Sequence, residues 1–301
     1  MESRFHNMID PEIIQKIKRM RIRANYLVND IFAGEYKSAF KGRGIEFEEI
    51  RPYQTGDDTR DIDWNITARF GYPFVKTYRE ERELTVMIMV DVSSSGRFGT
   101  KRRLKQDLAV ELAATLAYTA AKCNDRVGLI LFSKKVESYI HPGKGQAHVW
   151  KLVKELLGCE FLCCGTDIAI ALNYLTKVLR KRSVCFIISD FLDEGFEGAL
   201  STAAQKHQVT ALVVSDKREE KIPPLGLMAF QDAETGEMVW VNTGKHRFQE
   251  RFQQRVRIAR VNLTAMMRSS RTDVVQFATG QSITYPLLKY FRTRGQQTFG
   301  L

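Results

Sequence analysis

Between about residues 84 and 241, continuous apolar runs alternate with stretches in which apolar residues recur every three or four positions. Continuous runs predict strands that are buried on both faces, and they lie at 84–90, 126–132, 183–189 and 209–214. The periodic stretches predict helices, near residues 104–120, 149–157, 167–181 and 195–206. This alternation predicts an α/β fold, with a Rossmann-like, mostly parallel sheet and helices on both of its faces.

The sequence before this region, residues 1–83, has a different pattern. A helical pattern follows the Asp-Pro pair at 10–11, an N-cap and first-turn combination, and Gly34 interrupts it. A stretch rich in charged and turn-forming residues comes next, with short strands expected at 45–51 and 74–78. We therefore expect an N-terminal extension that is distinct from the sheet.

The sequence after the alternating region predicts helices over 245–270 and 283–292. The stretch 227–241 contains the turn-forming sequence ETGE between two short apolar runs, so it predicts a hairpin. The expected organisation has three parts: an extension (1–83), a Rossmann-like domain (84–241) and a C-terminal helical segment (242–301).

Hydroxyl and carboxylate side chains stand where the buried strands are expected to end. Asp91, Ser93 and Ser95 follow the first run, Asp190 follows the third, and Thr166 comes just before a predicted helix. Ligands of open α/β sheets bind beyond the carboxyl ends of the strands, and hard cations such as Mg²⁺ or Mn²⁺ take oxygen ligands. These residues are therefore candidate metal ligands; the alternative is that they only cap helices.

The D-x-S-x-S sequence at 91–95, with the later Thr166 and Asp190, resembles the metal-ion-dependent adhesion site of von Willebrand factor type A domains. The resemblance implies that Ser93, Ser95 and Thr166 ligate a divalent metal directly or through water, and that Asp91 and Asp190 hold its waters or bind it. It also implies one open coordination position for an acidic side chain of a partner.

This sequence departs from the commonest form of that site in two ways. Ser94 and Gly96 stand where a Gly and often a Met occur, and the following loop is strongly basic. Nearby positive charge weakens cation binding, unless these side chains point toward a partner instead. The basic residues of the loop are Arg97, Lys101, Arg102, Arg103 and Lys105.

A longer resemblance covers the chain from about Gly42 onward. The segments GRGIEFEEIRPYQTGDDTRDIDWNITAR (42–69) and EERELTVMIMVDVSSS (80–95), with several later segments in order, resemble the family called domain of unknown function 58. Such proteins are often encoded beside MoxR-type AAA+ ATPases. The resemblance implies a metal-dependent adaptor or accessory chaperone whose partner is such an ATPase, a client protein or both.

Several enzymatic and metal-binding alternatives lack their sequence signatures. The chain has no phosphate-binding loop and no Ser-His-Asp pattern, so we expect a binding protein and not an enzyme. Residues 61–72 do not form a calcium-binding loop, because Ile66 and Tyr72 stand where such a loop needs Gly and Glu. The carboxylates of 57–63 are instead expected to pair with Arg51, Arg60 and Arg69 around Trp64, or to bind a partner. Cys159, Cys163 and Cys164 lack zinc-site spacing.

The formal net charge of +11 supports a second hypothesis, that the chain binds nucleic acid or an anionic membrane surface. An Arg-rich helix from Lys245 onward with an apolar stripe would make the contact, although nucleic acid is the less favoured partner. The chain has an odd number of cysteines, no signal-like start and no long apolar segment. We therefore expect a cytoplasmic protein without a transmembrane span. Peripheral contact with a membrane stays open. The oligomeric state is not predicted.

Overall fold

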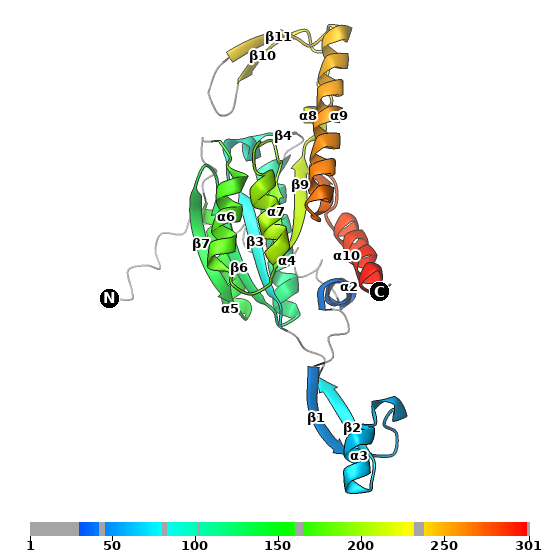
Figure 1. Cartoon of the computed structure of the whole chain (residues 1–301). Coiled ribbons are helices and arrows are strands. Elements are labelled where there is room, and N and C mark those ends of the chain that lie inside the picture. The colour runs from blue at the N-terminus through cyan, green and yellow to red at the C-terminus, as the bar shows by residue number, and fades with distance from the viewer. Residues whose placement is uncertain are drawn as a thin grey trace, which may run out of the picture.

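The computed structural model describes residues 30–41, 46–79, 83–100, 103–159, 165–231 and 238–299. Its centre is a six-stranded sheet with the order β12-β9-β8-β3-β6-β7. The strands are β3 (Thr85–Asp91), β6 (Arg126–Phe132), β7 (Val136–Gly143), β8 (Val184–Ser189), β9 (Gln208–Ser215) and β12 (Asp273–Ala278). The expected α/β fold is confirmed (Figure 1).

The order of the strands places a topological switch point in the middle of the sheet. Five strands are mutually parallel, and only β7 runs antiparallel, against β6 at one edge. Numbered along the chain, the order is the 3-2-1-4-5-6 arrangement of a doubly wound sheet. β3 and β8 are neighbours, but the connection after β3 leads to one half of the sheet and the connection after β8 leads to the other half. In sheets of this kind a crevice forms beyond the carboxyl ends of such a pair of strands.

Helices cover both faces of the sheet because successive strand residues point to opposite faces. In β3, Val86, Ile88 and Val90 share one buried cluster, while Met87 and Met89 belong to the other. The first cluster includes side chains of α4 (Lys105–Lys122), α5 (Gln146–Gly158), α2 (Asp30–Lys41) and α10 (Thr284–Phe299). The second includes those of α6 (Ile168–Val178), α7 (Glu197–Lys206) and the end of α9 (His246–Ser269).

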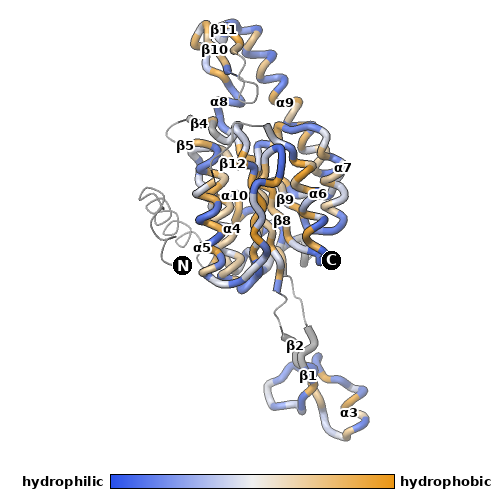
Figure 2. Tube along the Cα trace, turned by 90° about the vertical axis from the view of Figure 1, so that its left-hand side faces the viewer, coloured by the Kyte–Doolittle hydropathy of each residue, from blue (hydrophilic) through white to orange (hydrophobic). Residues whose placement is uncertain are grey.

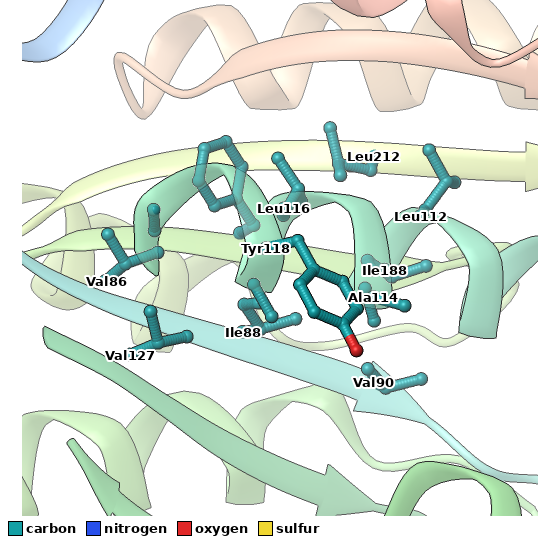
Figure 3. Packing of buried hydrophobic residues seen from close by; sticks show 14 of the residues in the cluster. Val86, Ile88, Val90, Leu112, Ala114, Leu116, Tyr118, Val127, Ile188 and Leu212 are labelled. Carbon is teal, nitrogen blue, oxygen red and sulfur yellow. The ribbon is translucent and has the colours of Figure 1, made fainter. Parts of the chain in front are cut away.

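The packing between α4 and the sheet forms the centre of the larger cluster (Figure 3). Leu112 and Leu116 of α4 are at most 1% exposed and belong to the same buried cluster as Ile88 and Ile188. Burying a side chain of this size contributes roughly 1.5–3 kcal/mol relative to leaving it exposed. This burial fixes α4, and with it the loop between β3 and α4, over the switch point.

The first and last described helices pack against each other, although they lie far apart in the sequence. Phe32 and Tyr36 of α2 make edge-on ring contacts with Phe291 of α10. Helix α2 passes through Gly34, so the expected interruption there is wrong. The aromatic side chains on both sides of Gly34 are buried against α10, and this tertiary packing outweighs the low helix propensity of one glycine.

The segment after residue 242 contributes a strand that sequence analysis missed. β12 pairs in parallel with β9 and forms an edge of the central sheet, so the packed core continues past the expected boundary at 241–242. The pattern DVVQFA is short and half-buried, with two polar residues, and it resembles neither a continuous apolar run nor a helix. The expected helices on either side of it are present as α9 and α10.

Two small substructures project from this body (Figures 1 and 2). The first contains the antiparallel strands β1 (Glu46–Pro52) and β2 (Phe74–Arg79) and the helix α3 (Trp64–Phe70), so both strands expected there are confirmed. The second, which we call the arm, contains the hairpin β10 (Leu227–Gln231) and β11 (Met238–Asn242) with the first turns of α9. Short elements complete the description: the 3-10 helices η1 (Thr59–Asp61) and η2 (Ser94–Arg97), the strands β4 (Gly99–Thr100) and β5 (Arg103–Leu104), and α8 (Lys217–Glu220).

No helix within the described residues combines the length and the apolarity that are needed to span a bilayer.

Candidate metal site

Asp91 is the last residue of β3 and the centre of the polar cluster at the switch point. Its side chain accepts hydrogen bonds from the Ser189 hydroxyl at 2.7 Å, the Ser93 backbone N–H at 3.0 Å and the Thr166 hydroxyl at 3.3 Å. The residue is only 7% exposed. Burial raises the pKa of the Asp91 carboxyl and the charge of Asp190 raises it further, while hydrogen bonds from Ser189 and Ser93 oppose both. A cation at this position would relieve both unfavourable effects.

The two serines of the loop lie side by side beyond Asp91. The hydroxyl oxygens of Ser93 and Ser95 are 3.1 Å apart. Ser93 precedes η2, but its side chain makes no capping hydrogen bond. Asp190 caps no helix either, because the next helix begins at Glu197 after Phe196. The capping alternative therefore does not explain Ser93 or Asp190.

Thr166 reaches the cluster because the neighbouring Asp167 anchors the start of α6. The Asp167 side chain accepts a hydrogen bond from the Ile170 backbone N–H at 2.8 Å, and its own N–H donates to the Ser133 carbonyl at 3.0 Å. This turn places the Thr166 hydroxyl against Asp91. The structure thus brings Asp91, Thr166 and the two serines to one end of the sheet.

Lys105, the first residue of α4, also contributes its side chain to the cluster. Its amine donates to Asp190 Oδ2 at 2.7 Å and to Glu219 Oε1 of α8 at 2.6 Å, and its side chain is 3% exposed. Burial lowers the pKa of Lys105, but the charges of both carboxylates and their hydrogen bonds raise it, and the net direction is upward. Lys105 is therefore a buried ammonium ion with two counter-ions.

This geometry corrects one expectation about the basic loop. Lys105 points into the site and not toward a partner, because its aliphatic stem is buried with α4 and its amine meets two carboxylates. The side chains of Arg97 and Arg103 and all of residues 101–102 lie outside what the structure describes. The expectation that the other basic residues face a partner stays a prediction.

The donor atoms around this point suit a hard divalent cation. A cavity of about 20 Å³, room for about one water molecule, is lined by Asp91, Ser95, Lys105, Ser189 and Asp190 among others. The described residues contain no cluster of three or more His, Cys, Asp or Glu side chains that could hold a metal. Any metal here would consequently depend on hydroxyl oxygens as well as on the two carboxylates, a ligand set typical of Mg²⁺ and Mn²⁺.

Three residues of this cluster are not among the predicted site residues: Ser189, Lys105 and Glu219. Ser189 had a usable signal, because it is the last residue of a buried strand and directly precedes Asp190. Lys105 and Glu219 had none, because nothing in a sequence indicates which of 46 basic residues turns inward. Their pairing spans 114 residues and depends on the close approach of α4 and α8.

The first projecting substructure contains a smaller polar network. Arg51 makes a two-pronged contact with Asp57 at 2.7 and 2.8 Å, as expected, and this contact lowers the pKa of the Asp57 carboxyl. Asp63 pairs with Lys76 at 3.1 Å. Trp64 is 69% exposed, so the expected network around it is wrong. The carboxylates instead fix the backbone of this substructure, where Asp63 also caps α3.

The cysteines that the structure describes carry no metal-site geometry. Cys123 and Cys185 are buried and Cys159 is partly buried, and burial strongly raises the pKa of Cys185. Cys163 and Cys164 lie outside the described residues.

The strand order, the antiparallel edge β7 and the Asp91–Ser95 loop at the switch point together define a von Willebrand factor type A-like domain. Residues 49–262 match the family described as "Protein of unknown function DUF58", and the chain belongs to this family. Similar proteins include the uncharacterized protein Rv1480 of Mycobacterium tuberculosis and the uncharacterized protein Mb1516 of Mycobacterium bovis. Each is 30% identical over 230 residues, which cover 75% of this chain and 73% of the relative.

Solved structures with a related arrangement include the hypothetical protein BatB from Bacteroides thetaiotaomicron. It is 19% identical with a TM-score of 0.47, over 72% of this chain and 100% of that chain. The SpRpn10 VWA domain is 11% identical with a TM-score of 0.35, over 69% of this chain and 95% of that one.

Proposed function

We propose that this chain is a non-enzymatic protein-interaction module that works with a MoxR-type AAA+ ATPase, as an adaptor or accessory chaperone. In this proposal Asp91, Ser93, Ser95, Thr166 and Asp190 hold Mg²⁺ or Mn²⁺ at the top of the sheet. The metal would supply an open position for an acidic side chain of the ATPase or of a client. The observation that carries the proposal is the convergence of Asp91, Thr166 and the two serines beyond the carboxyl end of β3.

The surroundings of the cluster suit a protein partner. Leu192, two residues after Asp190, is 72% exposed, and Phe98, just after η2, is 45% exposed. Protein interfaces are enriched in aromatic side chains, and the contacts around a central anchor exclude water from it. An incoming carboxylate would gain a metal ligand bond in a partly dehydrated setting, which strengthens the electrostatic attraction.

The test is retention of a MoxR-type ATPase from the same organism on the immobilised protein, in Mg²⁺ and in EDTA. We expect retention in Mg²⁺ only, and loss in Asp91→Ala and Thr166→Ala. Thr176→Ala is the matched control, because within the described part of the chain the Thr176 hydroxyl makes a local bond to the Asn173 carbonyl in α6. Circular dichroism checks that each variant folds. Equal retention in EDTA and by both site variants would show that the metal is not the contact.

A second candidate function, binding to an anionic membrane surface, is favoured by the arm. Trp240, Leu227 and Met238 are 57–66% exposed on its hairpin. The adjacent α9 carries six arginines against one glutamate (Arg247, Arg251, Arg255, Arg257, Arg260, Arg268; Glu250). Apolar and aromatic side chains beside arginines are typical of segments that lie in the headgroup region of a bilayer.

Sedimentation with vesicles tests this second candidate. We expect binding to phosphatidylglycerol vesicles but not to phosphatidylcholine vesicles, with reduced binding for Trp240→Ser and for Arg251→Gln. The matched control for the arginine is Arg180→Gln, an exposed position just after α6 and outside the arm. Binding to single- or double-stranded DNA in the absence of vesicle binding would favour nucleic acid instead, with a steep dependence on salt.

A further inference from the structure

We infer that Lys105 is a tethered counter-ion whose ammonium group competes with the divalent cation for Asp190 and sets the metal affinity of the site. The inference rests on the proposed metal site and names the residue that tunes it. Three observations support it: the contacts of the amine, the depth of its burial, and the second carboxylate that holds it.

The amine lies where a metal would need the same oxygen atoms. Lys105 Nζ is 2.7 Å from Asp190 Oδ2, and both side chains are at most 6% exposed. The cavity of about 20 Å³ beside them is lined by Asp91, Ser95, Lys105 and Asp190 alike. A metal bound to Asp91 and Ser95 in this space would be a close neighbour of the ammonium group.

Charge balance then decides between the two cations. Asp91 and Asp190 are two buried carboxylates, and such groups need nearby positive charge because burial removes most of their hydration. Lys105 already supplies one positive charge, so the gain from a divalent ion is reduced, and the two cations repel each other in a poorly screened interior. The ammonium group therefore weakens metal binding and stabilises the metal-free fold.

Glu219 is the second carboxylate that binds the Lys105 amine. Its Oε1 atom accepts from Lys105 at 2.6 Å, and its Oε2 atom accepts from the Asp216 backbone N–H at 3.0 Å in the cap of α8. Glu219 is thus held in place by its own helix. When a metal takes Asp190, the amine stays on Glu219, and the flexible lysine stem needs only a small rotation.

Binding of Mn²⁺, followed through the electron paramagnetic resonance signal of the free ion, tests the inference. We expect Lys105→Met to bind Mn²⁺ about tenfold or more tightly than the wild type, since close charge pairs are worth that much. Glu219→Gln should bind more weakly than the wild type, because the amine is then left to Asp190 alone. Lys151→Met is the matched control, an exposed lysine of α5 that removes the same charge far from the site, and it should leave the affinity unchanged.

A second readout covers the risk that Lys105→Met is unstable. Its melting temperature should fall below that of the wild type in EDTA, and Mg²⁺ should restore more of it than Mg²⁺ adds to the wild type. Equal Mn²⁺ affinities in the wild type, Lys105→Met and Glu219→Gln, with loss of binding in Asp91→Ala, would overturn the inference and leave the metal site standing. Absence of Mn²⁺ binding in every variant would overturn both.

Discussion

The top of the sheet and the arm lie at the same end of the molecule (Figure 1). They differ in which side chains they bury and which they expose to solvent. At the top of the sheet, charged side chains such as Lys105 and Asp91 are buried and each has partners within the chain. In the arm, large apolar side chains such as Trp240 are exposed. A buried charge without a partner costs several kcal/mol of stability, so each charged side chain at the top of the sheet needs a defined partner. Exposed apolar side chains, in contrast, do not stabilise the fold.

The pairing in the arm sharpens this contrast. In its hairpin, Met228 pairs with Val241 and Phe230 pairs with Val239, so four apolar side chains share one face. The opposite face carries Trp240, and a two-stranded hairpin has no core of its own beneath either face. Figure 2 shows the hairpin extending away from the body of the molecule. The composition of the arm therefore supports a contact outside the chain, whereas the composition of the site is already explained in part by contacts inside it.

The largest expected effect on stability comes from removing a buried charge at the top of the sheet. Asp190→Ala leaves Lys105 with Glu219 alone, and we expect a loss of about 2–4 kcal/mol, somewhat below the full cost of breaking a buried pair. Urea denaturation measures it. Glu194→Ala, an exposed acidic neighbour, should stay within about 0.5 kcal/mol of the wild type. Similar values for the two variants would mean that the pair does not order the site.

A smaller loss is expected from the hydroxyl that holds Asp91. Ser189→Ala removes a 2.7 Å hydrogen bond to the carboxylate and a 3.0 Å bond from the Phe191 backbone N–H. We expect destabilisation of about 1–3 kcal/mol, because a buried charged acceptor loses one of its donors. The same denaturation assay applies, with Ser201→Ala in α7 as the control, since the Ser201 hydroxyl bonds to the Ser270 hydroxyl and not to a charged group among the described residues. No change in Ser189→Ala would contradict the role assigned to this bond.

A pH-dependent effect is expected at His207, which is 2% exposed and whose ring nitrogens have no hydrogen-bond partner among the described residues. Burial lowers the pKa of His207 and the charge of Lys206 lowers it further. The unfolded chain then binds the proton more tightly, so stability is lost as the pH falls below about 6.5 toward the folded-state pKa. His207→Gln should reduce the loss of urea resistance between pH 7.5 and 5.5, whereas the exposed His246→Gln should not. A parallel decline in all three proteins would rule out His207 as a cause.

The smallest effect on stability is expected in the arm. Trp240→Ser and Leu227→Ser remove large exposed apolar groups, and the free energy of unfolding should change by no more than about 0.5 kcal/mol. Thermal melting followed by circular dichroism measures this. Binding to anionic vesicles or to the protein partner should fall in the same variants. A large loss of stability would show that the hairpin packs on the body and would remove the contrast between the two regions.

The regular part of the fold could be predicted from the sequence because its signals are local. Apolar runs such as 84–90 and 126–132 identify β3 and β6, and the residues that follow them identify the polar end of the sheet. The strand β12 could not be identified in the same way, because an edge strand is buried on fewer sides and its pattern is mixed. The helix break expected at Gly34 is wrong because tertiary packing of α2 outweighs the low helix propensity of glycine.

The candidate site could be predicted only in part, and the division has a physical cause. Asp91, Ser93 and Ser95 are close in the sequence, and their alternation alone places them on one side. The sequence shows the charge of Lys105 but not its burial, so it groups this residue with the other basic residues of the loop beside the site. Its two carboxylate partners are 85 and 114 residues away, so only the folded chain reveals that the amine serves as an internal cation.

The contact between α2 and α10 also has a consequence for how the protein is made. Glu35 and Arg292 pair at 2.8 Å although 257 residues separate them. A ribosome adds about 5–20 residues per second, so the synthesis of α10 follows that of α2 by on the order of 10–50 s. During that interval the aromatic face of α2 has no α10 to cover it, and β9 has no β12 at its edge. The nascent chain therefore carries exposed apolar surface until β12 and α10 have been synthesised, and faster synthesis of residues 273–299 would shorten the exposure.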